Sequence, residues 1–267
     1  METKELGNTG VMMPEIGIGV WRYSGGVEPL RRGIELDATL IDTAEVYGTE
    51  DVVAQAVKGI RDRIFIATKV SGSHLRHDEV LQAAEASLRR LDSGFIDLYQ
   101  IHWPNSSVPI KETMRAMETL VDRGLVRHLG VSNFDLADLR DAQAAMSKYP
   151  LVSNQVLYNL NRREIEGDLL PYCERNRITI IAYTPLDDGR LAVLPRLRPN
   201  KKMQALARVA AEVGKTLGQV ALNWCTSRSN VIAIPKSNHT KRVIENCQAS
   251  GWRLSEAQVQ MLDAAFS

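Results

Sequence analysis

The sequence contains few cysteines and no long apolar run. Its three cysteines, Cys173, Cys225 and Cys247, are widely separated, and no Cys-x-x-Cys pair occurs. We therefore predict neither a disulfide framework nor a zinc site. No stretch approaches the roughly 18 apolar residues that a membrane-spanning helix needs. The first residues also lack the apolar segment of a signal peptide. We expect a cytoplasmic protein without a membrane partner.

The chain also lacks an excess of either charge. Its 33 Lys and Arg residues balance 32 Asp and Glu residues to a net charge of +1, and both signs are interspersed. Such a chain has no broad positive field for nucleic acid, so we predict no nucleic-acid partner. His74, His77 and His128 have no metal-ligand spacing. We interpret them as surface or structural residues and predict no metal.

What the sequence does contain is a regular alternation of short apolar runs and longer segments with helical periodicity. The apolar runs predict strands at Ile16–Val20, Thr39–Asp42, Ile64–Lys69, Ile96–His102, Leu129–Ser132, Val152–Gln155, Thr179–Tyr183 and Val231–Pro235. The periodic segments between them predict helices such as Asp78–Leu91, Ile110–Asp122, Asp135–Lys148 and Thr216–Ser227. This order favours a parallel sheet with helices packed against it.

An open doubly wound sheet and a closed barrel both fit that alternation. The open dinucleotide-binding fold requires Gly-x-Gly-x-x-Gly after the first strand, but Arg22 stands where the third glycine belongs. We therefore predict an α/β fold, a (β/α)8 TIM barrel, as one domain over 1–267. Turn signals in Met1–Pro14 predict a hairpin that closes the barrel bottom. Thr184–Lys202 is a long connection, and Ser255–Phe266 predicts an extra C-terminal helix.

Polar residues stand at the end of every predicted strand. They are Trp21, Asp42, Lys69, His102, Ser132 with Asn133, Gln155, Tyr183 and Lys236. Taken singly, each is as ordinary as a helix cap or a solvated side chain. In an α/β barrel, however, the carboxyl ends of the strands meet at one mouth, where catalytic residues lie. Capping does not explain so many polar residues at one end.

Four residues near these ends form a candidate catalytic group. A Tyr hydroxyl loses its proton near pH ~10, so a proton donor at neutral pH needs tuning. We predict that Lys69 lowers the pKa of Tyr47 and that Asp42 holds the lysine ionised, while His102 either orients a substrate oxygen or shares in the proton transfer. This group protonates a carbonyl oxygen. No Ser or Cys is paired with a base in these segments, so no nucleophile is evident.

Six ordered segments of the chain resemble the aldo-keto reductase family, in particular its short prokaryotic members of the diketogulonate and aldehyde reductase group. They are DTAEVYGTE (42–50), ATKV (67–70), IDLYQIHWP (96–104), GVSNF (130–134), NQVLYN (154–159) and IPKSNHTKRVIEN (234–246). The resemblance covers nearly the whole chain, in matching order and spacing. It implies an oxidoreductase that transfers hydride from NADP(H) to an aldehyde or ketone.

The resemblance also assigns roles to individual residues. Tyr47 would be the general acid, tuned by Lys69 and Asp42, and His102 would orient the carbonyl. The nicotinamide carboxamide would be bound by Ser132, Asn133 and Gln155, with Tyr183 stacked on the ring. Thr184, Leu186 and Gly189 are candidates for the pyrophosphate. The adenosine end would be bound by Lys236, Ser237, Arg242, Glu245 and Asn246.

Two features of this sequence depart from the family pattern. His239 stands where the family often has a small hydroxyl residue beside the 2′-phosphate. Little follows Phe266, whereas longer members carry a tail over the substrate pocket. We therefore expect an open pocket walled by Trp21, Tyr23 and Trp103. We also expect activity on small aldehydes, α-keto compounds or keto-sugars, and a monomer.

Two other functions remain open at this point. Some relatives serve as non-catalytic accessory subunits, which would need the cofactor residues but not the catalytic ones. Alternatively, Lys69 could act as the Schiff-base amine of a barrel lyase or aldolase. The complete group of Tyr47, Lys69, His102 and Asp42 favours reductase chemistry over both.

Overall fold

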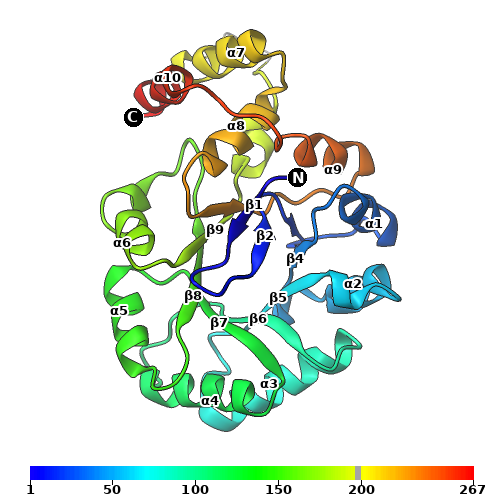
Figure 1. The fold of residues 1–267 in the computed structure, drawn as a ribbon, viewed down its shortest axis with the longest axis vertical. Helices are drawn as coiled ribbons and strands as arrows, with labels where there is room; N and C mark the ends of the chain where they lie inside the picture. Colours follow the sequence, from blue (N-terminus) through cyan, green and yellow to red (C-terminus); the bar gives the residue numbers. More distant parts are fainter. Residues whose placement is uncertain (196–199) are drawn as a thin grey trace.

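In the computed structural model, which describes residues 1–195 and 200–267, eight parallel strands curl into a barrel (Figure 1). They are β3 Ile18–Gly19, β4 Leu40–Asp42, β5 Phe65–Val70, β6 Ile96–Ile101, β7 Val126–Ser132, β8 Leu151–Leu157, β9 Thr179–Tyr183 and β10 Val231–Ala233. Neighbours in the sheet follow chain order. A parallel bridge between Ile16 and Ala233 joins its two edges. The predicted barrel is confirmed.

A two-stranded hairpin covers the end of the barrel at which the strands begin. Its strands, β1 Thr3–Glu5 and β2 Met12–Pro14, pair antiparallel. Leu6 and Met13 of the hairpin are buried in one cluster with interior side chains of the barrel such as Leu98. The backbone N–H of Gly7 donates to Thr179 Oγ1 at 2.8 Å, where β9 starts. Figure 1 shows the hairpin across the centre of the ring, as the sequence predicts.

Helices lie outside the barrel of strands, and two of them, at 201–213 and 256–266, pack together beyond the layer that surrounds it (Figure 1). The helices are α1 Val27–Glu35, α2 Glu50–Val57, α3 His77–Arg90, α4 Ile110–Asp122, α5 Leu136–Ala145, α6 Leu169–Arg175, α7 Lys201–Val213, α8 Leu217–Thr226, α9 Thr240–Cys247 and α10 Glu256–Phe266. In α3, Val80, Ala84 and Leu88 lie on the buried face, as the helical periodicity predicts. Within the described ranges, no helix is long and apolar enough to cross a membrane.

One predicted helix ends earlier than its sequence pattern suggests. The segment Asp135–Lys148 forms α5 only as far as Ala145, with Asp135 as its N-cap. The Glu118 carboxylate accepts backbone N–H groups of Ser147 and Lys148. These bonds replace the intrahelical ones, so the chain leaves the helix at this point.

The predicted long connection after β9 holds more structure than a loop. A short 3₁₀ segment, η4 Asp187–Ala192, follows the strand, and α7 begins after its N-cap Asn200. The part of this connection at 196–199 lies outside the described residues. The predicted C-terminal helix is α10, with Ser255 as its N-cap. It packs beside α7, which the sequence analysis missed (Figure 1).

Candidate active site

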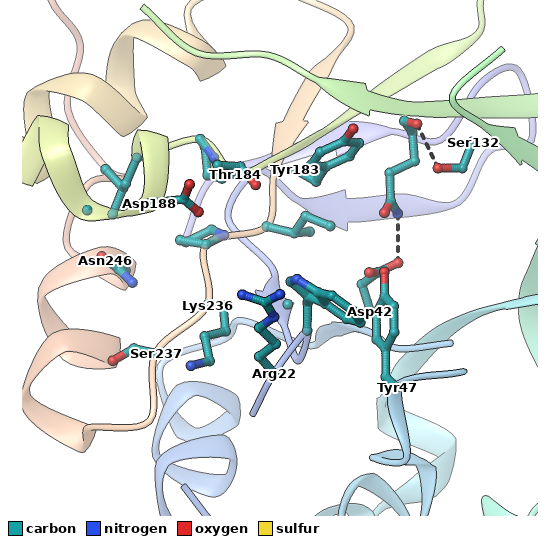
Figure 2. Close-up of a pocket in the computed structure, with 18 of the residues that line it drawn as sticks. Arg22, Asp42, Tyr47, Ser132, Tyr183, Thr184, Asp188, Lys236, Ser237 and Asn246 are labelled. Atoms are coloured by element: carbon teal, nitrogen blue, oxygen red, sulfur yellow. Dashed lines mark hydrogen bonds between the residues drawn. The ribbon is translucent and has the colours of Figure 1, made fainter. Parts of the chain in front are cut away.

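A pocket of about 900 Å³ opens at the end of the barrel where the strands finish, opposite the hairpin. The predicted residues that line it are Trp21, Asp42, Tyr47, His102, Trp103, Ser132, Asn133, Gln155, Tyr183, Thr184, Leu186, Gly189, Lys236, Ser237, Arg242, Glu245 and Asn246. These residues are far apart in the chain, and the carboxyl ends of the parallel strands bring them together at one mouth of the barrel. We call this expectation the strand-end rule. Figure 2 shows Asp42 and Tyr47 at one end of the pocket and Lys236, Ser237 and Asn246 at the other.

An ion pair lies beneath one end of the pocket. Lys69 is inside β5 rather than at its end, because the strand continues to Val70. Its side chain is fully buried, and Nζ donates to Asp42 Oδ1 at 2.7 Å and to the Thr43 carbonyl at 2.8 Å. Burial lowers the pKa of Lys69, and the contact with Asp42 opposes that shift. An amine held this way is poorly placed for Schiff-base formation, which weakens the aldolase alternative.

Tyr47 extends this group to the pocket surface. It ends the short 3₁₀ segment η1 Glu45–Tyr47, before Gly48 in the left-handed conformation. Its hydroxyl lies 3.5 Å from Lys69 Nζ and 3.3 Å from His102 Nε2. Burial, followed by the negative charge of Asp42, raises the pKa of Tyr47 well above its usual value. The prediction that the pKa of Tyr47 is lowered is wrong for this structure, because burial of the hydroxyl raises that pKa, and the nearby Asp42 charge adds to the rise.

His102 is half-buried and neutral at physiological pH. Burial lowers its pKa to about 4, and the positive charge of Lys69 acts in the same direction. Its ring centroid lies 5.4 Å from that of Tyr47 and 6.3 Å from that of Trp103. On the other side of Tyr47, the Trp21 ring lies 4.7 Å away. The Tyr47 ring therefore has Trp21 and His102 as aromatic neighbours, and Trp103 is the next neighbour of His102.

Neutral hydrogen-bonding groups from β7, β8 and β9 form the next part of the pocket. Asn133 adopts a left-handed backbone conformation with φ of 62°. Its amide donates to the His102 carbonyl at 2.9 Å and accepts the Tyr183 hydroxyl at 2.9 Å. Ser132 Oγ donates to the Gln155 carbonyl at 2.9 Å. Gln155 Nε2 donates to Asp42 Oδ2 at 2.7 Å, so these amides also hold the site together.

The far end of the pocket has a different chemistry. Lys236 and Arg242 are exposed there, and neither forms an ion pair within residues 1–195 and 200–267. Ser237 Oγ accepts the backbone N–H of His239 at 3.1 Å, just before α9 begins. His239 is exposed and is not among the pocket-lining residues. Two uncompensated cations beside a helix start suit a phosphate group.

Tyr23 is the predicted pocket-wall residue that the structure places elsewhere. Its side chain is buried, and its hydroxyl donates to the Gly26 carbonyl at 2.8 Å. The chain reverses direction after Trp21, with Arg22 at φ of 51°, so the two aromatic side chains separate. Trp21 and Trp103 do wall the pocket, each about half exposed, at 50% and 53%.

Sequence reasoning missed several pocket residues, among them Arg22, Val46, Val193 and Gly218. Arg22 follows Trp21, so the search of strand ends extended by one residue would have found it. Val46 lies beside Tyr47 in a recognised motif. Gly218 is the second residue of α8 and Val193 follows η4, and neither carries a local signal of pocket exposure.

Comparisons with known proteins show which family the chain resembles over most of its length. A model of the aldo/keto reductase family matches residues 15–266. Methylglyoxal reductase YeaE of Escherichia coli strain K12 is 39% identical over an alignment of 268 positions that covers 96% of this chain and 92% of that protein. Glyoxal reductase of Bacillus subtilis strain 168 is 34% identical over 269 residues, covering 98% and 92%. A crystal structure of an aldo/keto reductase from Klebsiella pneumoniae with NADP and acetate has a TM-score of 0.90 at 36% identity, covering 99% of this chain and 95% of that one.

Proposed function

Because the chain belongs to the aldo/keto reductase family, we propose that it reduces small aldehydes and α-keto carbonyl compounds with NADPH. Membership makes it an oxidoreductase that acts on carbonyl groups, and the resemblance in its motifs is thereby confirmed. The observation that carries the finer proposal is the placement of the Tyr47 hydroxyl. It lies in a pocket beside neutral His102 and above the buried pair of Lys69 and Asp42.

The chemistry of the pocket supports NADP(H) as the cofactor. Its neutral hydrogen-bonding residues lie near Asp42, whereas Lys236 and Arg242 lie at the other end. A nicotinamide ring with its carboxamide suits the first set, and a 2′-phosphate suits the second. The matched Klebsiella pneumoniae reductase was crystallised with NADP. We therefore propose Lys236, Ser237 and Arg242 as the residues that hold the phosphate.

Tyr47 would act as the proton donor. When bound, NADPH supplies the hydride that the carbonyl carbon receives. The Tyr47 hydroxyl donates its proton to the carbonyl oxygen, so the product is an alcohol. The ammonium of Lys69 then lies 3.5 Å from the oxygen that has lost its proton and stabilises its negative charge. A proton from solvent restores the hydroxyl.

His102 would orient the substrate. A neutral imidazole donates one hydrogen bond, and Nε2 faces the Tyr47 hydroxyl at 3.3 Å. A carbonyl oxygen that lies beside both groups would receive a hydrogen bond from each. The aromatic side chains of Trp21 and Trp103 leave room for a small carbonyl compound. The named activities of two relatives, on methylglyoxal and glyoxal, make 2-oxoaldehydes the first substrates to test.

Substitution of the proton donor tests this function. We expect Tyr47→Phe to lower kcat by roughly 10²–10⁴-fold, the usual contribution of general-acid catalysis. The affinity for NADPH, measured by protein fluorescence, should stay nearly unchanged, because the phenol lies away from the phosphate-binding end. The assay follows loss of NADPH absorbance with methylglyoxal, glyoxal and simple aldehydes, with NADH run in parallel.

Two outcomes would contradict the proposal. Retention of full activity by Tyr47→Phe would remove the tyrosine from the mechanism. A wild-type protein that binds NADPH but reduces none of these compounds would favour the accessory-subunit alternative.

A further inference from the structure

The Asp42 carboxylate is held from two sides. Its Oδ1 accepts Lys69 Nζ at 2.7 Å, and its Oδ2 accepts Gln155 Nε2 at 2.7 Å. Asp42 and Gln155 are each 2% exposed, so water does not compete freely for these bonds. In Figure 2, the dashed line that ends at Asp42 marks the bond to Oδ2. Both carboxylate oxygens therefore have a buried donor.

Gln155 also belongs to the set of neutral groups near the carboxamide end of the pocket. Its carbonyl accepts Ser132 Oγ at 2.9 Å, and Ser132 Oγ accepts Asn133 Nδ2 at 3.0 Å. One residue therefore connects the amide network with the group that surrounds Tyr47.

From this placement we propose that Gln155 is a positioning residue for the proton donor. It holds Oδ2 of Asp42 so that Oδ1 stays directed at Lys69, whose ammonium lies beside the Tyr47 hydroxyl. The inference deepens the proposed function and rests on it. In that reaction, the effect of Gln155 on proton transfer passes through Asp42, separately from any contact with the cofactor.

The choice of a neutral donor has a physical reason. A carboxylate with a single partner turns about its Cβ–Cγ bond and leaves its other oxygen buried without a hydrogen bond, which is costly. A second cation would satisfy that oxygen but would compete with Lys69 for the charge. A glutamine amide satisfies it with an N–H group and brings no charge. The ion pair with Lys69 then keeps one geometry.

Replacement by a carboxyl group gives a sharp test. In Gln155→Glu, the introduced carboxyl group faces Asp42, and two adjacent carboxylates do not both ionise readily. While protonated, the new group donates to Asp42 as the glutamine does. Once ionised, it repels Asp42 and competes for Lys69. We therefore expect kcat to fall by roughly tenfold or more as the pH rises through a pKa above the ordinary Glu value of about 4.3.

Several other titratable groups face this region and belong in the analysis of the pH profile. They are Lys69 from β5, Tyr47 from η1, His102 after β6, Tyr183 from β9 and, on the far side of Lys69, Glu50 from α2. The wild-type profile measured over the same range contains all of them. A decline found only in the variant therefore belongs to the introduced carboxyl group.

The measurement is kcat and KM for a non-ionising carbonyl substrate from about pH 5 to pH 9, with NADPH affinity at each pH. Gln155→Glu combined with Asp42→Asn is the matched control, because removal of the Asp42 charge should abolish the new decline. Ser132→Ala breaks the bond to the Gln155 carbonyl but leaves the pair with Asp42, so its profile should show no new ionisation.

A Gln155→Glu profile parallel to that of the wild type would overturn the proposal, as would a decline that persists in the double variant. If that variant fails to fold, Gln155→Met and Asp42→Asn form a double-mutant cycle in kcat. If the double variant loses less kcat than the product of the two single losses, the two residues are coupled, which supports the proposal. A loss equal to that product overturns the proposal. Failure of the proposed function itself would show in the wild type, which would then reduce no carbonyl compound.

Discussion

At the residue scale, the buried pair of Lys69 and Asp42 stabilises the fold only while both members are present. Lys69→Met would leave the Asp42 carboxylate buried with Gln155 as its remaining donor. We expect a loss of about 3–5 kcal/mol of unfolding free energy in urea titrations. The variant that combines Lys69→Met with Asp42→Asn should lose less than Lys69→Met alone, because no unpaired charge remains.

An exposed ion pair provides the control for this stability measurement. Arg32 and Glu35 pair on the surface of α1, with both side chains largely exposed. Arg32→Met should therefore change the unfolding free energy by about 1 kcal/mol or less. Equal losses of unfolding free energy in Lys69→Met and Arg32→Met would show that the buried pair contributes no more to stability than the exposed pair.

The pKa shifts of Tyr47 and His102 predict how the reductase responds to pH. Burial raises the pKa of Tyr47 above 10, so the hydroxyl remains protonated at neutral pH. The pKa of His102 is lowered to about 4, so the ring gains a charge only when the pH falls that far. Neither side chain changes its charge between these two pKa values. We expect kcat/KM for a non-ionising substrate to stay level from about pH 5, one unit above the His102 value, to at least pH 9, since the raised pKa of Tyr47 lies still higher.

Acid should lower this activity, because a protonated His102 places a second positive charge near Lys69. Stopped-flow measurement of NADPH oxidation in a constant-ionic-strength buffer checks the profile. A midpoint between pH 6 and pH 8 would show that the pKa of His102 lies nearer its ordinary value of about 6.5 than its burial indicates.

Sequence reasoning found residues near the pocket more reliably than it found their electrostatics. The strand-end rule located Asp42 and His102 because the carboxyl ends of parallel strands converge whatever the details of packing. It misplaced Tyr23, because the direction of a side chain after a tight turn depends on local backbone angles. It gave the wrong sign for the pKa shift of Tyr47, because the degree of burial comes from residues distant in the chain.

At the scale of secondary-structure elements, the sequence again predicts what local patterns determine and misses what tertiary contacts determine. The ranges predicted for α4 and β9 agree with the structure at both ends. Their apolar pattern and their boundaries are both local. The end of α5 differs because Glu118, in another helix, captures the backbone N–H groups that follow Ala145. Nothing in the sequence of residues 135–148 indicates the contact with Glu118.

The packing of α1 against the barrel depends on a glycine. A Cβ added at Gly33 would lie 2.5 Å from Ile18 Cδ1 and 3.0 Å from Val243 Cγ1. Both neighbours are buried, so they have little room to move. Overpacking of this kind costs about 1–3 kcal/mol, whereas alanine normally stabilises a helix by about 1 kcal/mol relative to glycine. We therefore expect Gly33→Ala to lower the free energy of unfolding by up to about 2 kcal/mol in urea titrations.

Gly94 offers a matched control for that substitution. A Cβ added there meets no atom within 4 Å, and its φ is not positive. Gly94→Ala should change stability by about 0.5 kcal/mol or less. Stabilisation by Gly33→Ala would mean that α1 shifts outward without loss of packing.

At the scale of the whole molecule, the barrel separates two tasks along one pocket. Strands near the start and middle of the chain supply the proton-donating group, and the segment from Lys236 to Asn246 supplies the cationic end. These regions are far apart in sequence, so a ligand that spans the pocket contacts both. Binding of such a ligand should stabilise the entire fold, since the unfolded chain has no equivalent site.

Arg242 should determine how much of that stabilisation depends on the 2′-phosphate. NADP⁺ at about 100 times its dissociation constant adds roughly 2.7 kcal/mol to the unfolding free energy, which raises Tm. We expect Arg242→Met to weaken NADP⁺ binding about tenfold or more and so reduce this stabilisation by about 1.4 kcal/mol. The smaller stabilisation by NAD⁺, which lacks the phosphate, should be nearly the same in both proteins.

Lys241→Met is the control, because Lys241 is an exposed neighbour of Arg242 on α9 that does not line the pocket. It removes the same charge from the same helix, so a long-range electrostatic effect would appear in both variants. A direct contact with the phosphate would appear only in Arg242→Met. Differential scanning fluorimetry at several NADP⁺ concentrations separates the two cases, and equal shifts in both variants would remove Arg242 from the cofactor site.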